Sequence, residues 1–257
     1  MQPFSVRAKR EAEAWAAVAR VNDPELDEPV TEMGFVERVE VDEDGAVALD
    51  FRLPTYWCSP NFAFLMLDGV RAALEALPWR PRANITLHDH LFADEVNEGL
   101  AAGKRFPEIF AELAPGEDLD ALREKFRMKA FQRRQEAMLA ALREAGWSTE
   151  AIVSLDRAAL DDPPPGLAAV FERYREAFVE RFPYAEPTGQ IVVEWSGARV
   201  ERDTFADHCA RLRSVRINME FNGALCRGLK EVRYRDKSDL TLVDFLPRSP
   251  IACGAAR

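Results

Sequence analysis

Residues 49–67, LDFRLPTYWCSPNFAFLML, combine the end of a strand, a loop with one cysteine and the start of a helix. Before the loop, apolar and polar residues alternate, which is the pattern of a strand with one buried face. After the loop, apolar residues recur at helical spacing, and Pro60 suits the first position of a helix with Ser59 as its N-cap. The stretch therefore predicts a strand over 46–53 and an amphipathic helix over 60–77.

The flanking segments extend this pattern into a small α-β-β-α-β domain over residues 1–112. The further elements that we expect are a helix over 8–20, a strand over 35–42 and a strand over 83–90. Because a helix joins the last two strands, we expect those strands to be parallel, with their carboxyl ends on one edge of the sheet.

Residues 113–257 have a different pattern, which predicts a mainly helical region with short strands, so the fold class is α+β. A linker is expected at 114–117, where Pro and Gly follow one another. The expected elements are helices over 118–145, 166–182 and 203–221, a hairpin over 190–202, and two short strands within 229–246. This region has no assigned function from sequence, and we expect it to bind a client protein.

Composition and charge exclude several functional classes. The chain has 257 residues, of which 47% are hydrophobic, and a formal net charge of −10, so a nucleic-acid partner is not expected. The basic stretch 123–134 is interpreted as a solvated helix face. No segment resembles a signal peptide or a membrane span, so we expect a soluble, cytoplasmic protein without a membrane partner.

The cysteines form no recognisable metal motif. The chain has four cysteines, far apart and without a CxxC pair, which indicates neither a disulfide framework nor a zinc ribbon. Cys209 and Cys226 are interpreted as core residues. The sequence has no nucleophile elbow, phosphate loop or HExxH motif, so a hydrolase or nucleotide-driven enzyme is not expected.

Three motifs of the N-terminal part occur in a characteristic order. Asp23-Pro24-Glu25-Leu26 follows the first helix, Met33-Gly34-Phe35-Val36 leads into a strand, and Leu53-Pro54-Thr55-Tyr56-Trp57-Cys58-Ser59-Pro60 joins strand and helix. Together they resemble the iron–sulfur cluster assembly domain family that includes SufT-like proteins and the phenylacetate-degradation protein PaaD. The resemblance covers roughly residues 8–100. The family usually has Thr-Ser-Pro-Gly-Cys-Pro before the helix, and PaaD-type proteins add a cysteine-paired zinc module that this chain lacks.

The resemblance implies an iron–sulfur cluster or iron as a transiently bound cofactor at Cys58. It also implies that Asp23 and Glu25 help to form the same functional edge, and Thr55 belongs to the Cys58 motif. A cysteine at a helix N-terminus lies near free N–H groups that favour the thiolate, the form that binds metals and clusters. The alternatives are that Cys58 packs the strand–helix turn and that the Asp23 loop is a solvated turn.

One thiolate cannot hold a cluster alone, because clusters are usually held by four ligands. Three solutions stay open: two protomers of a homodimer each supply Cys58, the cluster is held only briefly, or other side chains complete the site. For the last solution the candidates are His88 and His90, which a strand would place on one face, and the acidic residues Asp94 and Glu95. Such a set suits iron or zinc, and the alternative is a solvated strand end.

The sequence thus favours a maturation factor that is not an enzyme. Its expected role is to assemble an iron–sulfur cluster or iron centre in a client metalloprotein. By analogy with relatives tied to oxygenase pathways, the client is expected to be a component of a bacterial multicomponent oxygenase. Two rival hypotheses are a non-catalytic accessory protein that binds a partner through its helical half, and a small metalloenzyme that uses the two histidines and a carboxylate.

Overall fold

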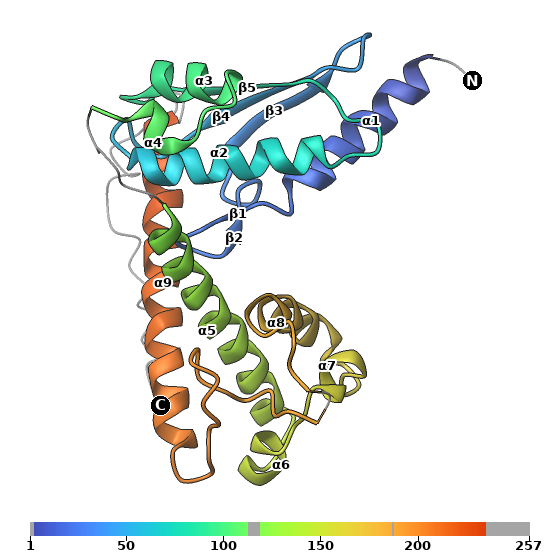
Figure 1. The fold of residues 1–257 in the computed structure, drawn as a ribbon, viewed down its shortest axis with the longest axis vertical. Helices are drawn as coiled ribbons and strands as arrows, with labels where there is room; N and C mark the ends of the chain where they lie inside the picture. Colours follow the sequence, from blue (N-terminus) through green and yellow to red (C-terminus); the bar gives the residue numbers. More distant parts are fainter. Residues whose placement is uncertain (1–2, 113–118, 187, 235–257) are drawn as a thin grey trace, which may run out of the picture.

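The computed structural model describes residues 3–112, 119–186 and 188–234 of the chain. Figure 1 shows an α/β layer built by the N-terminal half, residues 3–112, from which two long helices run down to a cluster of short helices. The elements of the N-terminal half are α1 (Pro3–Val18), β1 (Asn22–Asp23), β2 (Glu28–Pro29), β3 (Val36–Val41), β4 (Val47–Arg52), α2 (Pro60–Glu75), β5 (Ala83–His88), α3 (Ala93–Ala101) and α4 (Phe106–Ile109).

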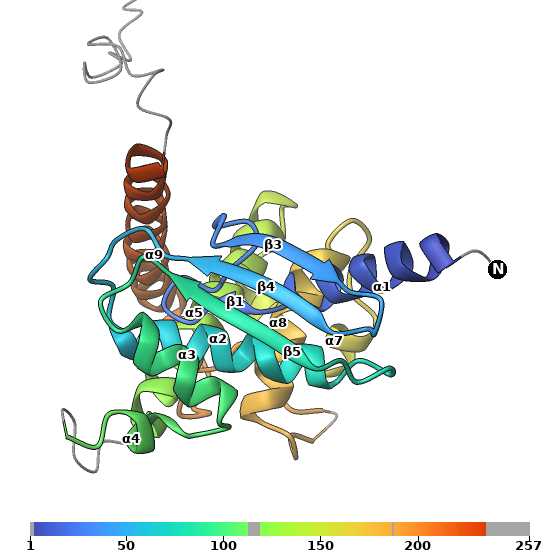
Figure 2. The same cartoon turned by 90° about the horizontal axis from the view of Figure 1, so that it is seen from above.

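The central sheet has the strand order β3-β4-β5. β3 pairs antiparallel with β4, and β4 pairs parallel with β5, so that Arg52 lies opposite His88 at the carboxyl end. The helix α2 joins the two parallel strands and packs with α1 against one face of the sheet (Figure 2). The predicted α-β-β-α-β order and the α+β class are confirmed. The two-residue strands β1 and β2, which form a separate small ladder, were not predicted.

Apolar periodicity explains how this layer is held together. In β4, Val47, Leu49 and Phe51 are buried while the residues between them are half-buried, as the alternation predicts. Helix α2 buries a stripe of apolar side chains against the same core, including Phe64 and Leu67. Ser59 occupies the predicted N-cap position, although its hydroxyl makes no capping hydrogen bond.

The C-terminal half, residues 119–234, is helical and has its own hydrophobic core. Its helices are α5 (Asp120–Glu144), α6 (Thr149–Val153), α7 (Ala158–Asp161), α8 (Ala168–Arg181) and α9 (Phe205–Tyr234). The predicted helices over 118–145 and 166–182 are confirmed as α5 and α8. The expected hairpin is reduced to the isolated bridge Val193↔Arg199 around a tight turn. The predicted linker at 114–117 lies outside the described residues.

A buried polar network fixes this irregular segment against the helices. Gln135 of α5 donates to the Tyr174 hydroxyl at 2.6 Å and to the Val193 carbonyl at 2.9 Å. Tyr174 in turn donates to the Ile191 carbonyl at 2.6 Å, and His208 of α9 bonds Gln135 through its ring. Because every one of these buried polar groups has a partner, the segment has a defined path without forming strands.

Helix α9 corrects the prediction for the end of the chain. The expected helix over 203–221 continues to Tyr234, so the strand expected to begin at 229 is wrong as far as the described residues extend. Aromatic and β-branched residues such as Val232 favour strands, but here tertiary contacts with the N-terminal half outweigh that weak preference. The rest of the predicted strand region, 235–246, lies outside the described residues. No helix in the described residues is long and apolar enough to cross a membrane.

A buried ion pair joins the two halves. The carboxylate of Asp27, 3% exposed, receives two hydrogen bonds from Arg134 of α5, at 2.7 and 2.9 Å. Arg173 of α8 approaches the same carboxylate at 3.3 Å. One residue of the loop between β1 and β2 therefore binds two helices of the C-terminal half.

The substitution Asp27→Asn should reduce the free energy of unfolding by about 3 kcal/mol, because it removes the buried charged partner of Arg134 and leaves only the exposed Glu176. Asparagine tolerates the positive φ of 51° at this position, so backbone strain does not contribute. Urea unfolding followed by circular dichroism measures the loss. The control is Glu172→Gln, which breaks an exposed pair with Arg175 and should change little. Equal losses in both variants would contradict the role assigned to Asp27.

Candidate functional site

Parallel pairing brings the loops after β4 and β5 to one edge of the sheet. Cys58 lies in the loop after β4, and His90 lies in the loop after β5. Two hydrogen bonds join these loops: His90 Nε2 lies 2.7 Å from the Cys58 carbonyl, and the Leu91 amide donates to the Tyr56 carbonyl at 2.8 Å. The expected arrangement of the cysteine and the second histidine at one edge is therefore present.

The hydrogen bonds of His90 define its role in the structure. The Phe92 amide donates to Nδ1 at 3.1 Å, so Nδ1 carries no proton and Nε2–H donates to the Cys58 carbonyl. Burial lowers the pKa of His90, which agrees with this neutral ring. Both ring nitrogens are thus engaged, and His90 holds the backbone of the cysteine loop in place.

The other predicted metal ligands are not gathered around His90. His88 lies 3.0 Å from Asp50, whose carboxylate also accepts from Arg38 at 2.6 Å. Asp94 and Glu95 lie in the first turn of α3, where the positive end of the helix dipole stabilises carboxylates. Within the described ranges, no group of three or more His, Cys, Asp or Glu side chains is arranged to hold a metal ion.

The expectation that both histidines lie on one strand face is wrong for a local reason. Strand β5 ends at His88, and Asp89 adopts a left-handed φ of 48°. That residue breaks the two-residue alternation, and His90 reaches the cysteine loop instead of continuing the face of His88.

The Cys58 thiol is half-buried and lies beside a hydroxyl. Thr55 Oγ1 lies 3.1 Å from Cys58 Sγ, so the structure brings these two predicted site residues together. Cys58 comes two residues before Pro60, at the N-terminus of α2. Its neighbour Trp57 is 76% exposed, which leaves a large aromatic surface next to the thiol.

Asp23 is the buried centre of the Asp-Pro-Glu-Leu loop. Its carboxylate accepts hydrogen bonds from the amides of Glu25, at 2.8 Å, and Leu26, at 3.0 Å. Burial raises the pKa of Asp23 to about 6, against the opposing effect of these two bonds. Glu25 lies 3.5 Å from Lys129 of α5. The loop is therefore an ordered turn that also contacts the C-terminal half.

Helix α9 ends against this same edge. Figures 1 and 2 show its last turns beside the carboxyl ends of β4 and β5. Lys230 donates to the carbonyls of Gly34 and Arg52, and the Tyr234 hydroxyl donates to the Leu53 carbonyl at 3.2 Å. Arg227 of the same helix forms an ion pair with Glu28.

Cys226 is the residue that the sequence analysis missed at this edge. It packs against the N-terminal core, as Cys58 does. Burial, together with the nearby acidic groups Asp23, Cys58 and Glu25, raises the pKa of Cys226 to about 11. Cys226 therefore lies on the side of α9 that packs against the N-terminal half, where Cys58 also lies. No sequence pattern could have found it, because Cys226 follows the helix expected over 203–221 and its place at this edge depends on how α9 packs.

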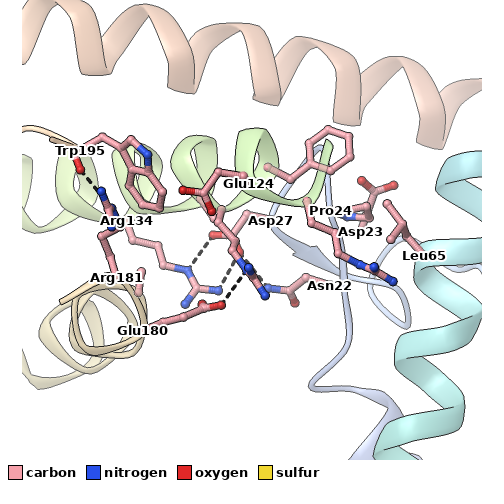
Figure 3. A pocket seen from close by; sticks show the side chains of 15 residues that line it. Asn22, Asp23, Pro24, Asp27, Leu65, Glu124, Arg134, Glu180, Arg181 and Trp195 are labelled. Carbon is pink, nitrogen blue, oxygen red and sulfur yellow. Dashed lines mark hydrogen bonds and ion pairs between the residues drawn. The ribbon is translucent and has the colours of Figure 1, made fainter. Parts of the chain in front are cut away.

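A cavity of about 320 Å³ lies between the two halves, next to the Asp23 loop (Figure 3). Arginines from α5 and α8 line it, and each has a partner. Arg127 pairs with Glu180 at 2.8 Å, Arg134 pairs with Asp27, and Arg181 donates to the Trp195 carbonyl at 3.1 Å. Because these cations are already engaged, the cavity does not favour an additional anion.

We expect the contribution of Asp23 to stability to fall as pH rises from about 4 to 6, because a raised pKa means that the folded state holds the Asp23 proton more tightly. This contribution is fully present below the unfolded pKa near 3.8 and is lost through the folded pKa of about 6. A shift of about two units corresponds to about 3 kcal/mol.

The substitution Asp23→Asn keeps an oxygen for the two amides and removes the titration. The variant should match wild type at pH 4 and exceed its unfolding free energy at pH 7, as measured by urea unfolding at both pH values. Asp44→Asn, at an exposed turn, serves as the control. Parallel pH profiles of wild type and Asp23→Asn would disprove this assignment.

Comparison with known proteins supports the resemblance of the N-terminal part. Residues 11–87 match the family model described as iron-sulfur cluster assembly protein. This range contains the Asp23 loop, the Met33-Gly34-Phe35-Val36 motif and Cys58, and it ends before His88. No curated protein and no solved structure matches the chain. The chain therefore carries, in its N-terminal part, a domain of the iron–sulfur cluster assembly family.

Proposed function

We propose that this protein is an assembly factor that accepts iron or an iron–sulfur cluster at Cys58 and passes it to a client metalloprotein. A general role in iron–sulfur cluster assembly follows from the family of residues 11–87. The observation that carries the finer proposal is the setting of the thiol. Cys58 is half-buried at the edge of the sheet, with its carbonyl held by His90 and its sulfur beside Thr55.

This setting suits transfer better than permanent storage. The thiolate is the form of cysteine that binds iron and clusters, and few protein ligands at the thiol leave coordination positions open to another molecule. In the part of the chain that the structure describes, no group of three metal-binding side chains closes around Cys58. The hydrogen bonds of the loop meanwhile keep the thiol in a defined position for the exchange of cargo.

The client that we propose is a component of a bacterial multicomponent oxygenase, either its iron–sulfur reductase or its iron hydroxylase. This choice rests on analogy with relatives tied to oxygenase pathways. The contribution of the C-terminal half would be recognition of that client.

An accessory role, in which the helical half binds a partner without cargo transfer, is the second candidate. The observation that favours it is an apolar stripe on α9, with five exposed side chains at helical spacing. Phe221 is the most exposed of them, at 69%. The stripe consists of Ile217, Phe221, Leu225, Leu229 and Val232.

Replacing Cys58 by alanine should abolish loading of the client in cells, because the cargo-binding thiolate is lost. The measurement is the iron and sulfide content of the oxygenase components purified from cells that contain wild type or Cys58→Ala. Cys209→Ala is the matched control, since it removes another half-buried thiol in the C-terminal half. Unchanged client loading in Cys58→Ala would rule out the assembly role of this cysteine.

A charge in the apolar stripe separates the two candidates. If α9 recognises the client, Phe221→Asp should weaken co-purification with the oxygenase component while leaving anaerobic cluster reconstitution on the factor intact. The thermal unfolding midpoint of Phe221→Asp is measured alongside, and an unchanged midpoint shows that misfolding does not cause the loss of binding. If binding is lost in Phe221→Asp and client loading is insensitive to Cys58→Ala, the accessory role is favoured.

A further inference from the structure

Two thiols from distant parts of the chain lie at the same edge of the N-terminal half, where the end of α9 contacts the chain after β4. We propose that Cys226 of α9 supplies a second thiolate to the iron or iron–sulfur cargo bound at Cys58. This inference rests on the proposed function and extends the site beyond the family domain, because the family match ends at residue 87.

Contacts on both sides of Cys226 fix the position of α9 along this edge. One turn before it, Gly223 lies so close to Glu28 that an added Cβ would stand 3.4 Å from the carboxylate. Directly after it, Arg227 pairs with the same Glu28, and one turn further Lys230 donates to the Arg52 carbonyl at the end of β4. The helix segment that carries Cys226 is therefore held against β2 and the carboxyl end of β4, from which the chain continues into the loop of Cys58.

The two cysteines also share their surroundings. Each is half-buried and packs against the core of the N-terminal half. Nearby acidic groups, the Cys58 thiol and the carboxylates of Asp23 and Glu25, contribute to the raised pKa of Cys226, which agrees with a shared position at this edge. A metal cation bound by the two thiols would be stabilised by electrostatic attraction to these acidic groups.

Two thiolates from one chain would supply half of the usual four ligands of a cluster. The remaining positions stay available for sulfide or for ligands of the client, as transfer requires. When the metal binds, each thiol gives up its proton to solvent and forms one sulfur–metal bond. Soft thiolate ligands suit iron–sulfur clusters and other thiophilic metals, and the arrangement needs no second protomer to provide a pair.

The chain offers a matched control on the same helix. Cys209 of α9 is also half-buried, but it lines a separate cavity in the C-terminal half beside Leu139, Arg143 and Phe205. Cys253 lies outside the described residues, so it is replaced by serine in every protein of the experiment.

The test is an anaerobic titration of the full-length chain with Co²⁺, a spectroscopic probe whose sulfur-to-metal charge-transfer absorption grows with the number of bound thiolates. At saturation, Cys58→Ser and Cys226→Ser should each show about half the wild-type absorption, because each keeps one of two thiolates. The double variant should lose the band, and Cys209→Ser should match wild type. Circular dichroism melting curves, together with a Cys226→Ala variant, control for misfolding.

The proposal is overturned if Cys226→Ser and Cys226→Ala both retain the wild-type absorption, or if wild type shows no thiolate band. The result is independent of the client experiment. A half-intensity band in Cys226→Ser together with unchanged client loading in Cys58→Ala would support the two-thiol site and reject the assembly role.

Discussion

The parallel pairing of β4 with β5 is the constraint on which the site depends. A helix must cross between parallel strands, so the chain leaves β4 and β5 at the same edge of the sheet. Cys58 follows the first strand and His90 follows the second, and the hydrogen bond between them joins the two loops. The core beneath, with Leu49, Phe51 and Leu87 buried, fixes the register that makes this contact possible.

The loop from Asp23 to Glu28 extends this edge into the C-terminal half. Asp23 organises the turn by accepting two backbone amides, and Asp27 binds Arg134 and Arg173. The carboxylate of Glu28 forms ion pairs with Arg133 of α5 and with Arg227 of α9. The motif of the family domain is thus also the surface on which the helical half is assembled. This dual use explains how a helix far along the sequence reaches the cysteine edge.

Much of the N-terminal half could be predicted because its elements follow from local patterns. The structure forms the elements that these patterns predict. They are the strand β4 with its alternating buried residues and the helix α2 with its apolar stripe and with Pro60 at its start. The prediction that His88 and His90 share one strand face failed at a single residue. The left-handed φ of Asp89 ends the alternation of the strand, and no local sequence pattern indicates that conformation.

The C-terminal half was harder to predict for a different reason. Helix α9 is held by contacts of Lys230 and Tyr234 with the N-terminal half. Such long-range contacts cannot be predicted from the spacing of apolar residues in the sequence. The position of Cys226 against the core of the N-terminal half has the same origin. Residue type suggested a packed core cysteine, and the packing itself brought it to the edge of the site.

Hydrogen exchange measured by mass spectrometry tests the central claim, that α9 docks on the cysteine edge, most directly. Peptides from the end of α9 and from the Cys58 loop are followed in wild type and in Glu28→Gln, which removes the ion pairs with Arg227 of α9 and Arg133 of α5. The account predicts that amides in both segments are protected in wild type and exchange faster together in the variant. Protection that is absent in wild type, or that changes in only one of the two segments, would contradict it.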